Sequence, residues 1–163
     1  MQARIRQTCL FAVVALGLVV VLASTTFAQP GSSNLGTWKL NLAKSTFAPG
    51  TAPKSSTFTN VVAGAGIKTT SDSVAADGTA RHSEYTQVYD GKDYPITNSL
   101  SGDVSTGTRV DANTVTFVYK NKGKVTITST NVVSSDRKTY TLTSKGTNTL
   151  GQTINSVAVY DKQ

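Results

Sequence analysis

Apolar and polar residues alternate along most of the chain that follows residue 36. A period of two predicts β-strands, because successive side chains of a strand point to opposite faces. Thr, Ser and Val dominate these segments, as suits half-buried strands, and no segment of helix length has an apolar period of 3.6 residues. The segments that we predict as strands are residues 38–42, 57–63, 67–74, 79–89, 94–97, 106–110, 114–120, 124–134, 139–144 and 152–161.

Short links rich in Gly, Asn and Asp separate most of these segments, and Asp77-Gly78 is one example. Links of this kind favour hairpins, and therefore an antiparallel meander of about eight to ten strands. The exception is residues 43–56, where Pro49 and Pro53 interrupt both helix and strand patterns. We predict a long loop there.

The meander predicts an all-β fold, and its two edges decide the architecture. An open meander leaves two unpaired edge strands, and closing the sheet into a barrel removes both. We therefore predict an up-and-down β-barrel, with a β-sandwich or an open curved sheet as the alternative. A barrel of about eight strands has an interior that side chains fill or that holds one small ligand.

The N-terminal segment has the pattern of a secretory signal peptide. Arg4 and Arg6 precede an apolar run at residues 10–23, and Ala28 is a small residue at a suitable cleavage point. The run of about 14 residues is shorter than the roughly 20 that span a bilayer. We therefore expect residues 1–28 to be removed, and the mature protein, without a membrane span, to be periplasmic or secreted.

Removal of this leader would leave 135 of the 163 residues, enough for one domain at residues 29–163. The only cysteine, Cys9, lies in the leader, so the mature chain would have no disulfide. The net charge of +7 would fall to +5 without Arg4 and Arg6. The basic residues are scattered, and the densest group flanks a predicted turn at residues 120–124. We therefore expect a monomer that binds no nucleic acid.

Alternation also assigns faces to the two strands around that turn. Ser129 and Asn131 fall on an otherwise apolar face, which indicates either a hydrogen-bonded network beside a wet cavity or a face assignment that slips near a strand end. The apolar residues on the inward faces are Val115, Phe117 and Tyr119 in the first strand and Val125, Ile127 and Val133 in the second.

The strand at residues 79–89 carries the only His and the only Glu of the chain on one face, and tyrosines on the other. If the tyrosine face is internal, Arg81 and Tyr85 offer a cation and a phenol to an acidic or polar ligand head. If the opposite face is internal, His82 and Glu84 point inward and can form a charged hydrogen bond. A catalytic site needs a third, orienting group, and none is evident from the spacing.

Searches for metal and nucleophile motifs give no candidate. One His and no mature Cys do not make a typical zinc site, and no acidic loop has calcium-site spacing. The serines lack a nucleophile motif such as Gly-x-Ser-x-Gly. We therefore expect a protein that is not an enzyme and that carries no cofactor and no metal.

Three short segments carry a resemblance. Residues 36–40, GTWKL, resemble the first-strand signature of the calycin superfamily, which includes lipocalins and fatty-acid-binding proteins, and residues 158–162, AVYDK, resemble its closing strand. The whole mature chain is also similar to small exported bacterial proteins described as lipocalin-like, in which YDGKDYP, here residues 89–95, recurs. The resemblance implies a barrel with Gly36 and Trp38 as structural residues of its closed end and a ligand entry at the other end.

Two departures limit what the resemblance implies. Ala158 stands where fatty-acid-binding proteins have an Arg that holds the ligand carboxylate, and the basic residue that lipocalins stack on the first-strand Trp is missing unless Lys162 supplies it. We expect an exported binder or carrier of a small hydrophobic or amphipathic ligand, or alternatively a structural or interaction module of the cell envelope. The residues that we predict to contact a ligand are Arg81, Tyr85, Phe117, Tyr119, Ser129 and Asn131.

Overall fold

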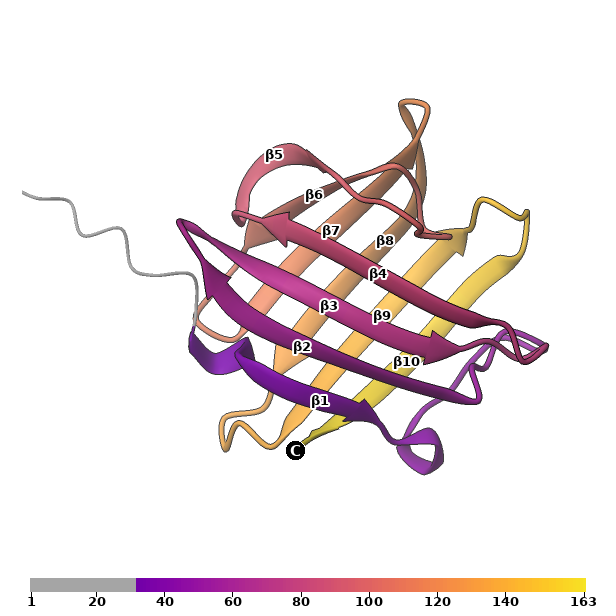
Figure 1. Ribbon diagram of the computed structural model, residues 1–163, viewed down its shortest axis with the longest axis horizontal. Coiled ribbons are helices and arrows are strands. Elements are labelled where there is room, and N and C mark those ends of the chain that lie inside the picture. The colour runs from indigo at the N-terminus through magenta and orange to yellow at the C-terminus, as the bar shows by residue number, and fades with distance from the viewer. Residues whose placement is uncertain (1–31) are drawn as a thin grey trace, which may run out of the picture.

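A computed structural model describes residues 32–163, and the predicted leader with its cleavage point lies outside these residues. Ten strands form one antiparallel sheet in the order β4-β3-β2-β1-β10-β9-β8-β7-β6-β5 (Figure 1). The strands are β1 (Gly36–Leu40), β2 (Ser55–Ala63), β3 (Gly66–Val74), β4 (Ala80–Gln87), β5 (Asp90–Pro95), β6 (Val104–Arg109), β7 (Thr114–Asn121), β8 (Lys124–Val133), β9 (Thr139–Thr147) and β10 (Thr153–Lys162).

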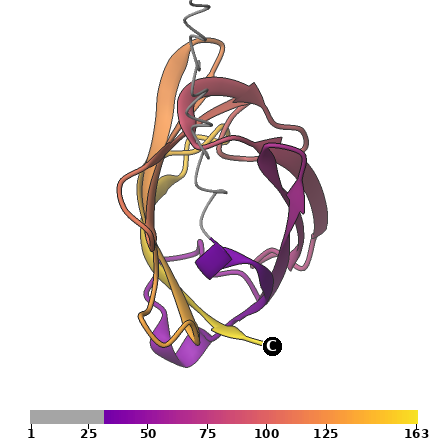
Figure 2. The same ribbon diagram turned by 90° about the vertical axis from the view of Figure 1, so that its left-hand side faces the viewer.

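The predicted all-β meander is confirmed, and the sheet rolls into a nearly closed barrel (Figure 2). Its decisive pairing joins the first strand to the last, with Trp38 opposite Lys162 and Leu40 opposite Tyr160. Strand ends differ from the prediction by a few residues. The first strand ends at Leu40, because Leu42–Lys44 form a short 3-10 helix, η2, with Asn41 as its N-cap. Within residues 32–163, no helix has the length and apolar character needed to cross a membrane.

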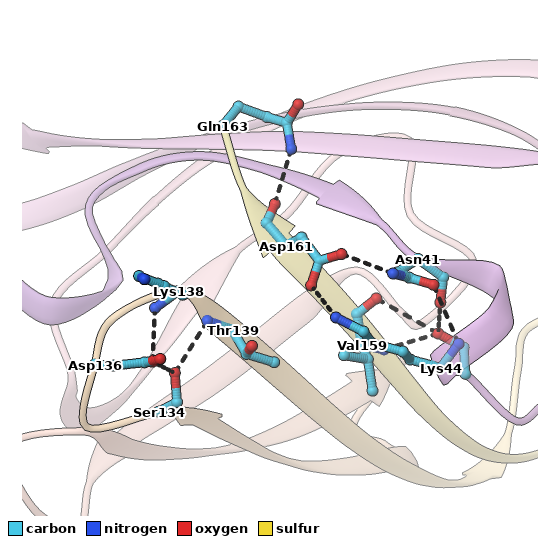
Figure 3. A network of polar contacts seen from close by, with 10 residues as sticks. Asn41, Lys44, Ser134, Asp136, Lys138, Thr139, Val159, Asp161 and Gln163 are labelled. Carbon is cyan, nitrogen blue, oxygen red and sulfur yellow. Dashed lines mark hydrogen bonds and ion pairs between the residues drawn. The ribbon is translucent and has the colours of Figure 1, made fainter.

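Polar contacts fasten the seam between β10 and η2 (Figure 3). The Asn41 amide donates to the Asp161 carboxylate at 2.7 Å, across 120 residues of sequence, and the Lys44 ammonium lies 2.9 Å from the other carboxylate oxygen. The Ser45 hydroxyl accepts a hydrogen bond from the Val159 backbone N–H. Hydrogen bonds from Asn41 and Lys44 lower the pKa of Asp161, so this carboxylate is charged at neutral pH.

Closure is incomplete, because β4 and β5 are the two ends of the sheet and do not pair with each other. The expectation that closure removes both edges was therefore wrong. Side chains take the place of a ladder, and the Gln87 amide donates across the gap to the Ser105 carbonyl at 3.1 Å. Gly107 leaves room for this, since a Cβ there would lie 3.0 Å from the Tyr89 ring and 3.1 Å from the Gln87 amide nitrogen.

The predicted inward faces of β7 and β8 are correct for Val115, Phe117, Ile127 and Val133, which are buried. The predicted inward position of Val125 is wrong, because its side chain is 60% exposed. The cause is a bulge: Tyr119 pairs with Ile127, but the next residue, Lys120, pairs with Val125. One extra residue in β8 turns the alternation over at this point.

The two ends of the barrel differ. At one end, the 3-10 helix η1 (Ser32–Asn34) lies beside a core of large side chains. At the other end lie the loop of residues 45–54, the β3–β4 and β9–β10 turns, and the loop of residues 96–103 between β5 and β6. The core cluster comprises Trp38, Phe58, Val133, Tyr140, Ala158 and Tyr160.

Candidate functional site

The barrel encloses a chamber of about 190 Å³ beside the Trp38 core. Five of the six tyrosines of the chain line it: Tyr85, Tyr89, Tyr119, Tyr140 and Tyr160. Apolar contact comes from Phe58, Ile96, Phe117 and Leu142. The other lining side chains are small and polar: Asn60, Thr69, Ser71, Ser83, Ser99, Ser101 and Asn131. The lining is therefore mixed, with aromatic faces and hydrogen-bonding groups around one small space.

Strand β4 turns its tyrosine face inward, so Ser83 and Tyr85 line the chamber. The opposite face points outward, and its two charged residues have partners on β3. The His82 Nδ1 lies 2.7 Å from an Asp72 carboxylate oxygen, and the Glu84 carboxylate lies 3.1 Å from the Lys68 ammonium. His82 and Glu84 therefore engage different neighbours on the outer surface rather than each other.

Burial controls the chemistry of the chamber tyrosines. It raises the pKa of Tyr89 to about 12 and the pKa of Tyr119 well above its ordinary value, and interaction with the neighbouring phenols raises both further. The phenols are therefore neutral at neutral pH and act as hydrogen-bonding groups. The Tyr89 hydroxyl accepts from the Asn34 amide at 3.1 Å, and the Tyr160 hydroxyl donates to Ser56 at 3.2 Å. Among residues 32–163, the Tyr119 hydroxyl has no hydrogen-bond partner.

Ser129 and Asn131 are both buried and belong to one network, which favours the first of the two interpretations of their polar character. The Ser129 hydroxyl donates to the Asn131 side-chain oxygen at 2.7 Å and accepts from Ser144 at 3.0 Å. The Asn131 amide points at the Tyr140 hydroxyl, 3.4 Å away. Asn131 lines the chamber, whereas Ser129 does not line it and holds Asn131 through their hydrogen bond.

Trp38 packs at the closed end and has no exposed surface. Its indole N–H donates to the Asn34 carbonyl at 3.0 Å, and its ring centre lies 5.3 Å from that of Tyr140. The Lys162 ammonium lies 5.2 Å from the centre of the indole, so Lys162 supplies the basic residue that the sequence left open. Gly36 makes this possible, because its φ is +107° and a Cβ there would lie 3.2 Å from the Lys162 stem.

A second space of about 420 Å³ forms the mouth at the other end of the barrel. It shares Ser101 with the chamber, and Leu100 and Ser101 belong to the loop of residues 96–103 that lies between the two spaces. The Leu100 carbonyl accepts from the Thr149 backbone N–H at 2.9 Å, and the Ser101 carbonyl accepts from the Thr126 hydroxyl. This loop is therefore fastened across the barrel at two points.

Arg81 lies on the rim of the mouth and not in the chamber. It also lines an open groove of about 690 Å³ between β4 and the loop of residues 96–103. Its side chain is half-buried, and the buried Nε has no hydrogen-bond partner within the described part of the chain. Of the six predicted contact residues, the structure thus brings Tyr85, Phe117, Tyr119 and Asn131 to the chamber, with Ser129 behind it and Arg81 at its entrance.

The volume of the chamber restricts what it can enclose. Ligand pockets for drug-sized molecules are about 300–1,000 Å³, whereas a dry cavity of about 150 Å³ is enough for benzene. At about 190 Å³, the chamber has room for one ring of that size. A larger molecule has to extend past Ser101 into the mouth.

Several lining residues were missed by the sequence analysis. Tyr140 lies two residues before Leu142, and Tyr160 lies two residues after Ala158. A period of two therefore predicts that each pair shares one face of its strand. The position of residues 96–103 could not be predicted in this way, because no periodicity places a loop across a barrel end.

Comparisons with known proteins give few matches. No protein-family model matches this chain, and no curated protein matches it. Among solved structures, the chain is similar to the zebrafish ileal bile acid-binding protein complexed with cholic acid. The two chains are 12% identical, with a TM-score of 0.49, and the match covers 81% of this chain and 100% of the other.

Proposed function

We propose that this protein binds a small amphipathic molecule inside its barrel. The observation that carries the proposal is the chamber inside the barrel, where five tyrosines and seven small polar residues line a space of about 190 Å³. Enclosed spaces with apolar and aromatic walls and a few convergent polar groups are typical ligand sites.

The lining favours an amphipathic ligand over a plain hydrocarbon. Phe58, Phe117 and Leu142 offer apolar contact, but the chamber also holds the unpartnered Tyr119 hydroxyl. A hydrocarbon would shield that hydroxyl from water without offering a hydrogen bond, at a cost of about 1–3 kcal/mol. A ligand with a hydroxyl, carbonyl or amide group removes this cost.

We further propose that the protein is exported before it binds its ligand. The support is the leader pattern of Arg4, Arg6, the apolar run at residues 10–23 and Ala28. N-terminal sequencing of the protein made from its complete gene would give a start near Gln29. A mature protein that begins at Met1 would contradict export by this leader.

Native mass spectrometry tests ligand binding on the protein as purified. We expect a second mass that disappears after organic extraction. The extracted protein should then bind the fluorescent probe N-phenyl-1-naphthylamine, and the retained compound should displace it. An extracted protein that binds neither the probe nor the retained compound would contradict a usable cavity.

A blocking variant locates the site. Ser83 lines the chamber, and Ser83→Phe places a ring in it, whereas Ser55→Phe adds the same ring on the exposed start of β2. Ser83→Phe should lose probe binding and Ser55→Phe should keep it, with circular dichroism as the check on folding. Equal binding by both folded variants would place the probe outside the chamber.

A further inference from the structure

We infer that the ligand is an anion whose charged group binds Arg81 at the mouth while its ring occupies the chamber. This inference rests on the proposed function and adds the chemical class of the ligand. It joins two observations, a chamber of single-ring size and a half-buried guanidinium without a carboxylate partner at the entrance to it.

Arg81 lies on the same inward face of β4 as the chamber residues Ser83 and Tyr85. Residues two apart on a strand are separated by about 6.6 Å, so Tyr85 and Arg81 mark a path of about 13 Å from the chamber to the mouth. Ser101 borders both spaces, so the chamber and the mouth adjoin at the loop of residues 96–103. A molecule that fills the chamber would reach Arg81 with an arm that passes Ser101.

No acidic side chain of the described residues forms an ion pair with Arg81. Asp72 pairs with His82, and Glu84 pairs with Lys68. The remaining acid at the mouth, Asp77, is exposed, and its carboxylate accepts the Thr79 backbone N–H at 2.8 Å. Asp77 is therefore engaged in its own turn. Hydrogen bonds from Thr79 lower the pKa of Asp77 and the charge of Arg81 contributes, but within residues 32–163 Asp77 and Arg81 form no ion pair.

The Arg81 side chain has an unpaired hydrogen-bond donor within the described residues. A guanidinium has five N–H donors and stays charged, and its partial burial is unfavourable unless those donors are paired. Here the buried Nε has no partner within residues 32–163. A carboxylate, sulfonate or phosphate in the mouth would accept from the terminal nitrogens of the guanidinium, and arginine binds such groups through two parallel hydrogen bonds.

The mixed chamber lining completes the description of the ligand. One aromatic or similar ring fits about 190 Å³ and stacks against tyrosine and phenylalanine faces. Hydroxyl or carbonyl substituents on the ring match Tyr119 and Asn131. The structure thus assigns to this site a hydroxylated or carbonyl-bearing ring compound with an anionic arm.

Two fluorescent probes with the same carbon skeleton test the charge requirement. 1-Anilinonaphthalene-8-sulfonate carries a sulfonate, and N-phenyl-1-naphthylamine does not. Arg81→Gln should weaken sulfonate binding by about tenfold or more, the effect of losing a charged hydrogen bond, and should leave binding of the neutral probe within about twofold. Arg137→Gln, in the exposed β8–β9 turn, is the matched control and should change neither.

The outcomes separate this inference from the proposed function. If Arg81→Gln changes neither probe, or weakens both equally, the anion site is wrong although the chamber still binds ligands. If the extracted wild-type protein binds neither probe and does not rebind the compound that it retained on purification, the proposed function and this inference both fail.

A second measurement needs no variant and stands even if Arg81→Gln does not fold. On the wild-type protein, 4-phenylbutyrate should displace N-phenyl-1-naphthylamine at a concentration about tenfold lower than 4-phenylbutan-1-ol does. Equal potency of the acid and the alcohol would overturn the inference.

Discussion

Raising the pH should unfold this protein, because the tyrosines that line the chamber resist ionisation only while it is folded. Burial is the largest cause that raises the pKa of each of them, and for Tyr89 the pKa reaches about 12. In the unfolded chain a tyrosine titrates near pH 10. Above that pH the unfolded state binds fewer protons than the folded state, so the free energy of unfolding falls as the pH rises. The stabilisation is complete below about pH 10 and is lost progressively above it, through about pH 12 for Tyr89.

The magnitude follows from the difference between the two states. At pH 11, ionisation stabilises an unfolded tyrosine of pKa 10 by about 1.4 kcal/mol. The same ionisation stabilises Tyr89 in the folded state by less than about 0.1 kcal/mol. Each further chamber tyrosine that stays protonated in the folded state adds to this loss, and the total that holds a domain together is only about 5–15 kcal/mol. The unfolding midpoint should therefore lie above pH 10.

The assay combines two signals during one alkaline titration. Absorbance at 295 nm counts tyrosinates, and far-ultraviolet circular dichroism reports the sheet. We expect most tyrosinate absorbance to appear in the same step in which the sheet is lost. Urea unfolding at pH 9, 10 and 11 gives the slope of stability against pH, and Tyr119→Phe should reduce that slope by about one proton at pH 11. The corresponding change at Tyr94, which does not line the chamber, should reduce it less.

The reasoning would be refuted by tyrosines that titrate one by one near pH 10 while the sheet stays intact. That result would mean that water reaches the phenols freely, and that the chamber is part of the solvent. An unchanged slope of stability against pH in Tyr119→Phe would also show that folding does not protect Tyr119 from ionisation.

Three further changes test the two ends of the barrel. Gly36→Ala should lower the free energy of unfolding by about 1–3 kcal/mol, because φ is +107° and the Cβ would crowd Lys162. Gly151→Ala, with a positive φ but open space around it, should lower the free energy of unfolding less. Equal losses in urea unfolding would show that crowding against Lys162 is not the cause. Lys162→Met keeps the stem but removes the charge over the Trp38 ring, and should cost about 0.5–1 kcal/mol, whereas unchanged stability would show that the cation–π contact contributes nothing. Gly102→Ala would place a Cβ 2.1 Å from the Lys120 carbonyl and should displace the loop of residues 96–103. The Thr149 amide, which donates to that loop, should then exchange with solvent faster by NMR, and unchanged exchange would show that the loop stays in place.

The period of two was enough to predict most strands and the inward positions of Phe117 and Tyr119. This succeeded because alternation is local: neighbouring side chains of any strand point to opposite faces whatever lies across from them. The same rule failed at Val125, where a bulge adds one residue to the register. A bulge depends on the partner strand, and the sequence of one strand does not reveal it.

The sequence by itself thus determined the all-β class, the order of the hairpins and the tyrosine-rich character of several strands, because these depend on residues close together in the chain. Only the tertiary structure decided that β1 closes against β10, that β4 and β5 stay apart, and that residues 96–103 cross the barrel end. It also decided that Arg81 lies at the entrance without a carboxylate partner in the described chain. Each of these depends on pairings between distant segments, such as Asn41 with Asp161, and the free energy of such pairings is set by the assembled barrel and not by local sequence.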